Sequence, residues 1–166
     1  KYYFDDQGTE VNEMGHFIMY DQIAQFDEGY FSSLDDQLYL LDPGFDKVDS
    51  LLLDTSIISL HILNDSLVLV STHHSVYLLN PELSLIAHSA AHGQITLSAI
   101  TENLIWLAQD EGSYLYSVDL ALQPVDTFAI HPDIKMGYLQ GRDSLLVLTG
   151  NYNGSSGYSS FFHASS

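Results

Sequence analysis

The stretch Leu38-Tyr39-Leu40-Leu41-Asp42 is written three times in this chain, with small changes. It returns as Val76-Tyr77-Leu78-Leu79-Asn80 and again as Leu115-Tyr116-Ser117-Val118-Asp119. The successive tyrosines are 38 and 39 residues apart. Aromatic residues flanked by aliphatic ones favour β-strands. A self-similar strand unit of about 40 residues therefore predicts a fold built from repeated β-sheets.

Each repeat divides into four short apolar runs separated by turn residues. In the second repeat the runs are Ile57–Leu63, Leu67–Val70, Val76–Leu79 and Leu83–His88. The second run is apolar throughout, which is typical of a strand covered on both faces. The sequence predicts an all-β fold, a β-propeller made of four-stranded antiparallel blades of about 40 residues, with three complete blades and a partial fourth.

We expect one domain over residues 1–166, with blades at approximately 15–54, 55–92, 93–132 and 133–166. In the fourth unit a polar insert, Gly150–Gly157, precedes the last apolar run, Tyr158–His163. Four blades could close a ring if Tyr2–Phe4 supplied the missing outer strand. The alternative, which fits better because the last unit stops within a blade, is a part of a ring of about six to eight blades, with the remaining blades as partners.

The charge is strongly negative. There are 22 acidic residues against Lys1, Lys47, Lys135 and Arg142, a net charge of −18, and residues 1–54 alone carry −11. Such a surface repels nucleic acid and anionic membranes, so neither is expected as a partner. It would attract cations or a basic protein. No apolar run is long enough to span a membrane.

Cysteine is absent from the chain, so disulfides, thiolate metal sites and cysteine nucleophiles are excluded. Serine nucleophile motifs are missing too, because Gly154-Ser155-Ser156-Gly157 lacks the Gly-x-Ser-x-Gly spacing and precedes a strand. We therefore assign no catalytic residue, and the sequence favours a protein that is not an enzyme.

The repeated strand, with its closing Asp or Asn and the turn after it, resembles bacterial extracytoplasmic propellers of the quinoprotein-like and NHL-like kind over about residues 15–163. The chain departs from tryptophan–aspartate repeats, since its one tryptophan, Trp106, is not followed by Asp. It also lacks the repeated tryptophans of quinone-binding propellers, so no quinone cofactor is expected. The resemblance implies an extracytoplasmic location: periplasmic, cell-surface or secreted.

Two sets of residues are candidate metal ligands. Asp5, Asp6 and Glu10 surround Gly8 in a loop whose oxygen-rich composition suits calcium. His88, His92 and His131 stand near corresponding ends of two outer strands and could share a transition metal. We expect no cofactor, with bound calcium as the alternative.

Three functions remain open on the sequence alone. The leading hypothesis is a non-enzymatic binding scaffold that presents loops to a protein or glycan partner. The alternatives are a hydrolase or lyase with a site in the central channel, and a calcium-stabilised surface module. A propeller fold by itself does not choose among them.

Overall fold

The structure is a computed structural model that describes residues 21–64, 66–91, 93–109, 114–130, 133–152 and 155–163. Within these residues it contains fifteen strands and no helix. No described helix is therefore available to cross a membrane.

The strands form four antiparallel sheets, each made of consecutive strands. Blade 1 comprises β1 (Gln22–Phe26), β2 (Gly29–Leu34), β3 (Gln37–Leu41) and β4 (Lys47–Leu52). Blade 2 comprises β5 (Ile57–Asn64), β6 (Leu67–Thr72), β7 (Ser75–Leu79) and β8 (Leu85–Ala90). Blade 3 comprises β9 (Ile95–Ile100), β10 (Leu104–Gln109), β11 (Tyr114–Asp119) and β12 (Pro124–Ala129). Blade 4 comprises β13 (Ile134–Arg142), β14 (Leu145–Tyr152) and β15 (Ser155–His163). The predicted propeller of three complete blades and a partial fourth is confirmed.

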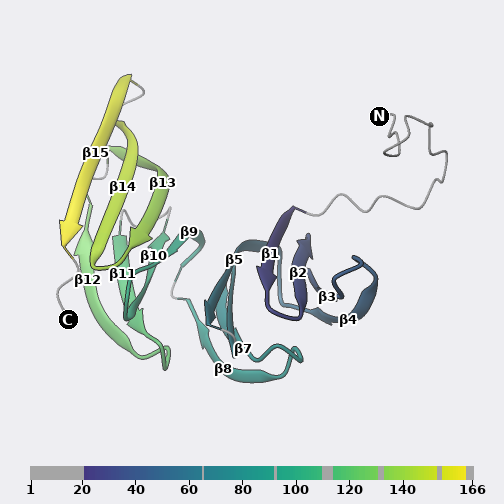
Figure 1. The fold of residues 1–166 in the computed structure, drawn as a ribbon. Helices are drawn as coiled ribbons and strands as arrows, with labels where there is room; N and C mark the ends of the chain where they lie inside the picture. Colours follow the sequence, from purple (N-terminus) through teal and green to yellow (C-terminus); the bar gives the residue numbers. More distant parts are fainter. Residues whose placement is uncertain are drawn as a thin grey trace, which may run out of the picture.

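The blades stand side by side in an open arc, with blade 1 and blade 4 at its two ends (Figure 1). The first strand of each blade contacts the first strand of the next, through the pairs β1 and β5, β5 and β9, and β9 and β13. The fourth strands lie outermost, and β12 is exposed along its whole length. The described strands thus form part of a ring. The expected closing segment, Tyr2–Phe4, lies outside the described residues.

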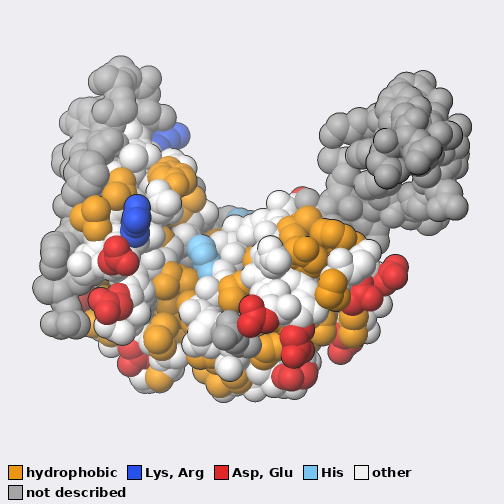
Figure 2. Space-filling model, in the orientation of Figure 1, with side chains coloured by type: hydrophobic (Ala, Val, Ile, Leu, Met, Phe, Trp, Pro, Cys, Tyr) orange, Lys and Arg blue, Asp and Glu red, His pale blue; other side chains and the backbone are white. Residues whose placement is uncertain are grey.

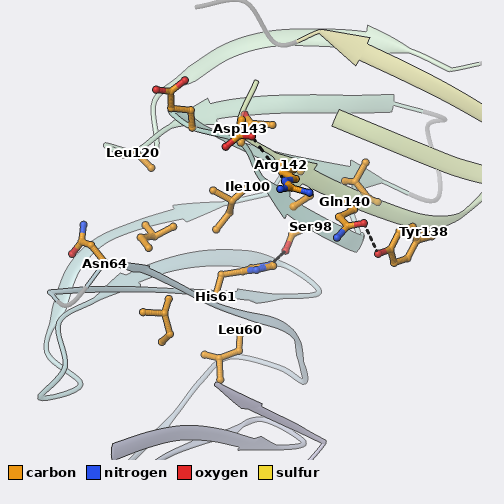
Figure 3. A pocket seen from close by; sticks show the side chains of 17 residues that line it. Leu60, His61, Asn64, Ser98, Ile100, Leu120, Tyr138, Gln140, Arg142 and Asp143 are labelled. Carbon is orange, nitrogen blue, oxygen red and sulfur yellow. Dashed lines mark hydrogen bonds and ion pairs between the residues drawn. The ribbon is translucent and has the colours of Figure 1, made fainter. Parts of the chain in front are cut away.

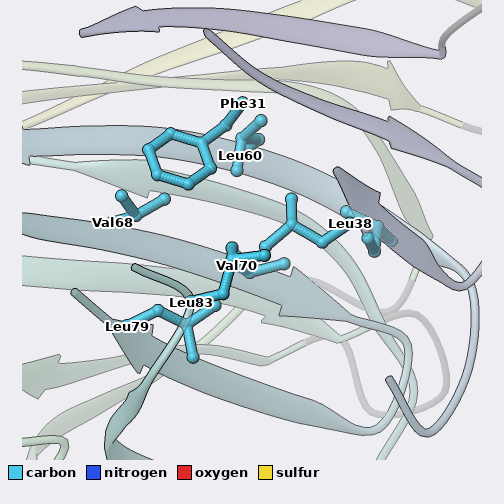
Figure 4. Close-up of a cluster of buried hydrophobic side chains, with 8 residues drawn as sticks. Phe31, Leu38, Leu60, Val68, Val70, Leu79 and Leu83 are labelled. Carbon is cyan, nitrogen blue, oxygen red and sulfur yellow. The ribbon is translucent and has the colours of Figure 1, made fainter. Parts of the chain in front are cut away.

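The core lies between the blades. The first hydrophobic cluster joins Phe31 and Leu38 of blade 1 to Val68 and Val70 of blade 2 (Figure 4). Leu69, between those two valines, points the other way into the second cluster, with Ile105 and Leu107 of blade 3. Successive side chains of a strand face opposite sides of its sheet. An apolar second strand therefore contributes to two interfaces at once, as the lack of alternation predicted.

The third cluster joins blade 3 to blade 4. Trp106 and Ala108 of β10 pack against Leu146 and Leu148 of β14. The indole Nε1 of Trp106 donates a hydrogen bond of 3.0 Å to Thr101 Oγ1, which satisfies its buried polar atom. Trp106 is therefore a packing residue of the interface between blades 3 and 4.

The tyrosine of the repeated stretch belongs to the same packing scheme. Tyr77 lies against the first cluster and Tyr116 against the second, so each contacts the interface with the preceding blade. Burial raises the pKa of Tyr116 to about 12.

The last residue of the repeated stretch builds the turn to the outer strand. Oδ1 of Asp42, Asn80 and Asp119 accepts a backbone hydrogen bond four residues on, from Asp46, Ser84 and Gln123 respectively. Asp and Asn are favoured in turns because their side-chain oxygen can accept hydrogen bonds from nearby backbone amides.

The same turn places a bulky residue in the left-handed region at Phe45, Leu83 and Leu122, with φ of 66°, 60° and 60°. The expected outer strand of the second repeat began at Leu83, and this start was wrong by two residues, since β8 begins at Leu85. A left-handed backbone cannot continue a β-strand, so β8 and β12 begin after it.

The links between blades are also repeated. The amide of Ile57 donates to the carbonyl of Asp35, at 2.7 Å, and the amide of Ile95 donates in the same way to His73, at 2.8 Å. In both cases the first strand of a blade is tied to the turn between the second and third strands of the preceding blade. The backbone carbonyl of His73 therefore helps to join blade 3 to blade 2.

The side chain of Asp54, in the segment that connects blade 1 to blade 2, makes further hydrogen bonds to blade 2. Its carboxylate accepts hydrogen bonds from Thr72 Oγ1, at 2.9 Å, and Ser75 Oγ, at 2.8 Å. Burial alone would raise the pKa of Asp54, but these hydrogen bonds, with one from Tyr77, hold it below its usual value.

The polar insert Gly150–Gly157 is largely strand. β14 continues to Tyr152 and β15 begins at Ser155, and the two pair as a hairpin from Leu145 and His163 to Tyr152 and Ser155. Backbone pairing of β14 with β15 therefore extends into the insert, through Gly150, Asn151 and Tyr152 on one strand and Ser155 and Gly157 on the other.

Candidate functional site

A groove lies on the inner side of the arc in the described part of the chain. It is formed by the C-terminal halves of β5, β9 and β13 and has a volume of about 1130 Å³. We call it the inner groove. The side chains discussed below are His61, Asn64, Ser98, Glu102, Tyr138, Gln140 and Arg142, all of which line it.

A short hydrogen-bond chain crosses the wall between blades 2 and 3. His61 Nε2 lies 3.2 Å from Ser98 Oγ (Figure 3). Ser98 Oγ is in turn hydrogen-bonded to Ser59 Oγ. Burial lowers the pKa of His61, so its imidazole is neutral at pH 7. A neutral imidazole beside a hydroxyl can accept its proton, and it also satisfies a polar group in a mostly apolar wall.

The wall contributed by blade 4 is more exposed and more polar. Tyr138 donates a hydrogen bond of 2.9 Å to Gln140 Oε1, and Arg142 Nε lies 3.9 Å from Asp143 Oδ2 (Figure 3). The Arg142 and Asp143 side chains are 88% and 90% exposed. An ion pair so open to water contributes little to stability, so both groups remain available to a ligand.

A smaller notch lies between blades 1 and 2. It has a volume of about 370 Å³, and three of its lining residues are the acids Asp27, Glu28 and Glu82. Beside them stand Phe26 and Pro81. Asp and Glu side chains are gathered along the convex rim of the arc in Figure 2.

Of the predicted metal ligands, only His88 lies within the described residues, so neither metal site is tested. His88 lies on β8 with its ring against Tyr77, at 4.7 Å between centroids. His92, His131, Asp5, Asp6 and Glu10 lie outside the described residues. No group of three or more His, Asp or Glu residues that could hold a metal occurs in the described part. Calcium at Asp5, Asp6 and Glu10 stays a prediction, which melting with and without a chelator tests.

Sequence reasoning missed His61 and Ser98. A histidine and a serine inside apolar inner strands were the available signal, because a buried polar group needs a partner. The signal was incomplete, since the partners lie 37 residues apart in the sequence and meet only when blades 2 and 3 stack.

Comparison with known proteins finds no matching family model and no matching curated protein. Solved structures do match. The Pan2 WD40 domain of Neurospora crassa has a TM-score of 0.69 at 11% identity, over 87% of this chain and 48% of that one. BamB of Moraxella catarrhalis has a TM-score of 0.62 at 12% identity, over 78% of this chain and 42% of that one. The computationally designed Ika4 protein has a TM-score of 0.74 at 14% identity, over 92% of this chain and 95% of that one.

These likenesses agree with the arrangement of the sheets and define the chain as a β-propeller protein. The chain spans about half the length of the Pan2 domain and of BamB. At such low identity the likeness concerns the fold, and the function has to be argued from the groove.

Proposed function

We propose that this protein is a non-enzymatic binding scaffold that holds a segment of a partner protein in the inner groove. The observation that carries the proposal is the groove itself, about 1130 Å³ in volume and formed by three blades. Small-molecule pockets are typically about 300–1,000 Å³ and enclose their ligand. An open groove at or above that size suits a loop or an extended segment of protein.

The residues on the groove support a protein partner. Tyr and Arg are enriched among residues that dominate binding energy, and Tyr138 and Arg142 both line the groove in exposed positions. Between them Gln140 offers an amide, and Asn64 and Glu102 offer further polar groups on the opposite side. The frame beneath is a stack of paired sheets, so little ordering is needed when a partner binds.

Site-specific photo-crosslinking tests the proposal. A photoreactive amino acid is placed at Tyr138 in the groove and, as a matched control, at Val125 on the outer strand β12; both positions are exposed, at 49% and 54%. We expect a crosslinked partner from Tyr138 alone. The partner is then purified, and Tyr138→Ala and Arg142→Ala should each weaken its binding by about tenfold. Equal crosslinking at both positions, or binding unchanged by both substitutions, would contradict the proposal.

A second experiment distinguishes a protein partner from a glycan partner. A glycan array probed with the intact protein should show no binding that Tyr138→Ala abolishes. Array binding that depends on Tyr138 would identify a glycan scaffold instead, since an exposed tyrosine can stack on a sugar ring.

A hydrolase is the second candidate, and the contact between His61 and Ser98 is the observation that favours it. A hydroxyl hydrogen-bonded to a neutral imidazole is the minimal arrangement of a serine nucleophile and its base. A panel of ester and peptide substrates tests this. Turnover that disappears in both Ser98→Ala and His61→Gln would establish the hydrolase, whereas no turnover by the unmodified protein would exclude it for the substrates tried.

The extracytoplasmic location is also proposed. It is supported by the resemblance of the repeated strand to extracytoplasmic propellers and is compatible with a chain free of cysteine. Fractionation of the source cells, followed by immunoblotting for this chain, tests it, and recovery in the cytoplasmic fraction would contradict it.

A further inference from the structure

The inner groove and the notch between blades 1 and 2, which we call the acidic notch, lie beside each other. The notch is formed by the β1–β2 turn, the β7–β8 turn and Ser66 of the β5–β6 turn. Asn64, at the start of that last turn, lines the groove (Figure 3). The amide of Ser66 donates a hydrogen bond of 2.8 Å to Asn64 Oδ1. One short turn therefore separates the two hollows, and a single extended segment of protein can reach both.

The charged residues that line the two hollows are mostly acids. Five exposed carboxylates are found there, on Asp27, Glu28, Glu82, Glu102 and Asp143. Among the described residues, Arg142 is the one Lys or Arg that lines either hollow, which leaves a net charge of −4. A concave surface with one sign of charge concentrates the electric field and gathers groups of the opposite sign.

The turns between first and second strands place these carboxylates along one mouth of the arc. Glu28 follows β1, Glu102 follows β9 and Asp143 follows β13. The amide of Glu102 donates to the carbonyl of Asp143 at 2.7 Å, so the turns of blades 3 and 4 are joined directly. At the other end, the β1–β2 turn and Ser66 line the same notch. The acids thus form a row that runs from blade 1 to blade 4.

The surface between the carboxylates is largely apolar. Ile62, Leu63 and Ile100 line the groove, together with Leu120, which is 37% exposed. Phe26 lines the notch. Lys and Arg side chains pack an apolar stem on such a surface while the charged end reaches a carboxylate. An aromatic ring also attracts a cation over its face. A basic segment therefore matches both the apolar floor and the acidic rim.

Arg142 is compatible with a basic segment. Its Nε lies 3.9 Å from Asp143 Oδ2, so the neighbouring carboxylate balances part of its charge (Figure 3). The guanidinium carries five N–H donors and no acceptor. It can donate to the backbone carbonyls of a bound segment, which are present whatever the side chains of that segment are.

We propose that the partner segment held in the inner groove is basic. It is an extended stretch with several Lys or Arg residues, which follows the groove, passes the β5–β6 turn and places one cationic side chain in the acidic notch. This inference rests on the proposed function, because it names the chemistry of the segment that the groove holds. It adds a contribution from the notch, which the proposed function does not use.

Selection from displayed peptide libraries tests the charge of the segment. Three phage libraries of equal peptide length carry Lys and Arg, Asp and Glu, or Ser and Gln at alternate positions, and each is selected on the intact protein. We expect enrichment from the basic library alone. Enriched peptides are then labelled and titrated by fluorescence anisotropy. Tyr138→Ala should weaken their binding by about tenfold, which shows that they occupy the groove.

Charge reversal tests the notch, with a control that changes the net charge equally. Glu28→Lys combined with Glu82→Lys alters the notch, and Asp49→Lys combined with Asp126→Lys alters β4 and β12; all four side chains are exposed. The notch variant should bind the basic peptides at least about tenfold more weakly, and the control should stay within about twofold. Raising the salt from about 50 mM to about 500 mM should weaken binding by the unmodified protein more than by the notch variant. Unfolding curves check that both variants fold.

Failure of this inference and failure of the proposed function give different results. Enriched peptides that need Tyr138 but are acidic or uncharged would overturn the basic segment and leave the binding groove standing. The same holds for basic peptides that bind the notch variant as tightly as the control. Selections that enrich no peptide, or only peptides indifferent to Tyr138→Ala, would contradict both.

Discussion

Replacing Gly141 by alanine should separate blade 4 from blade 3. β13 approaches β9 so closely here that a Cβ on residue 141 would lie 1.8 Å from the carbonyl oxygen of Ile100 and 2.4 Å from its carbonyl carbon. Both atoms are backbone and cannot rotate away. The two strands would have to move apart by more than 1 Å before this contact became tolerable.

The cost follows from what such a movement does to the third cluster. A gap of about 0.5–1 Å already forfeits a quarter to a half of the dispersion energy of the facing atoms. Leu139, two residues before Gly141 in β13, and Leu146 and Leu148 in β14 belong to the third cluster at this interface. Overpacking a well-filled interior typically costs about 1–3 kcal/mol, so we expect Gly141→Ala to lower the free energy of unfolding by that amount.

Gly137 provides a matched control on the same strand. A Cβ there would meet nothing closer than the carbonyl oxygen of Thr149, at 3.9 Å. Gly137→Ala should therefore be neutral or stabilise by up to about 1 kcal/mol, because alanine restricts the unfolded chain. Urea unfolding followed by fluorescence of Trp106, which lies at this interface, measures both variants. The reasoning is refuted if the two variants unfold within about 0.5 kcal/mol of each other.

Two further predictions concern titrating groups. The free energy of unfolding should fall between about pH 8 and pH 5, because unfolded His61 takes up a proton near its ordinary pKa of 6.5 while burial keeps the folded side chain neutral. His61→Gln should reduce this slope in urea titrations at the two pH values, and an unchanged slope would contradict the assignment. Asp54→Ala should cost about 1–3 kcal/mol at pH 7 by leaving the Thr72 and Ser75 hydroxyls without their acceptor, whereas exposed Asp49→Ala should be near neutral. Because the folded pKa of Asp54 lies below its ordinary value of 3.8, the difference between the variant and the unmodified protein should hold at neutral pH and shrink in acid.

The repeat made the architecture predictable. Tyr39, Tyr77 and Tyr116 set the period, and the apolar second strands indicated sheets covered on both sides. The turn after each repeat was recognised from its Asp or Asn, but the first residue of the outer strand was misplaced. Leucine is common in β-strands, so nothing in the sequence indicated that Leu83 lies in a turn. Its left-handed backbone conformation follows from its position in the hydrogen-bonded turn after Asn80.

The inner groove was less predictable because it depends on contacts between blades. His61 meets Ser98 only after two sheets stack, and no short motif encodes that pairing. The metal sites proposed at Asp5, Asp6 and Glu10 and at His88, His92 and His131 stay predictions, because His88 alone among these residues lies in the described part of the chain. Side chains brought together by stacking are those of facing, non-equivalent positions, as Trp106 and Leu146 are.

The consecutive order of strands within each sheet has a consequence for how the chain folds. Among the described strands, every hydrogen-bonded pair joins neighbours in sequence, and each blade packs on the next one along the chain. Folding can therefore nucleate in any blade and spread outward, in the manner of a one-dimensional array. The two middle blades, supported on both sides, should retain their amide hydrogens longest in exchange with heavy water, while the end blades open first. Stability in such a molecule is a gradient along the chain, and adding a neighbour at either end would raise it most in the blade that it touches.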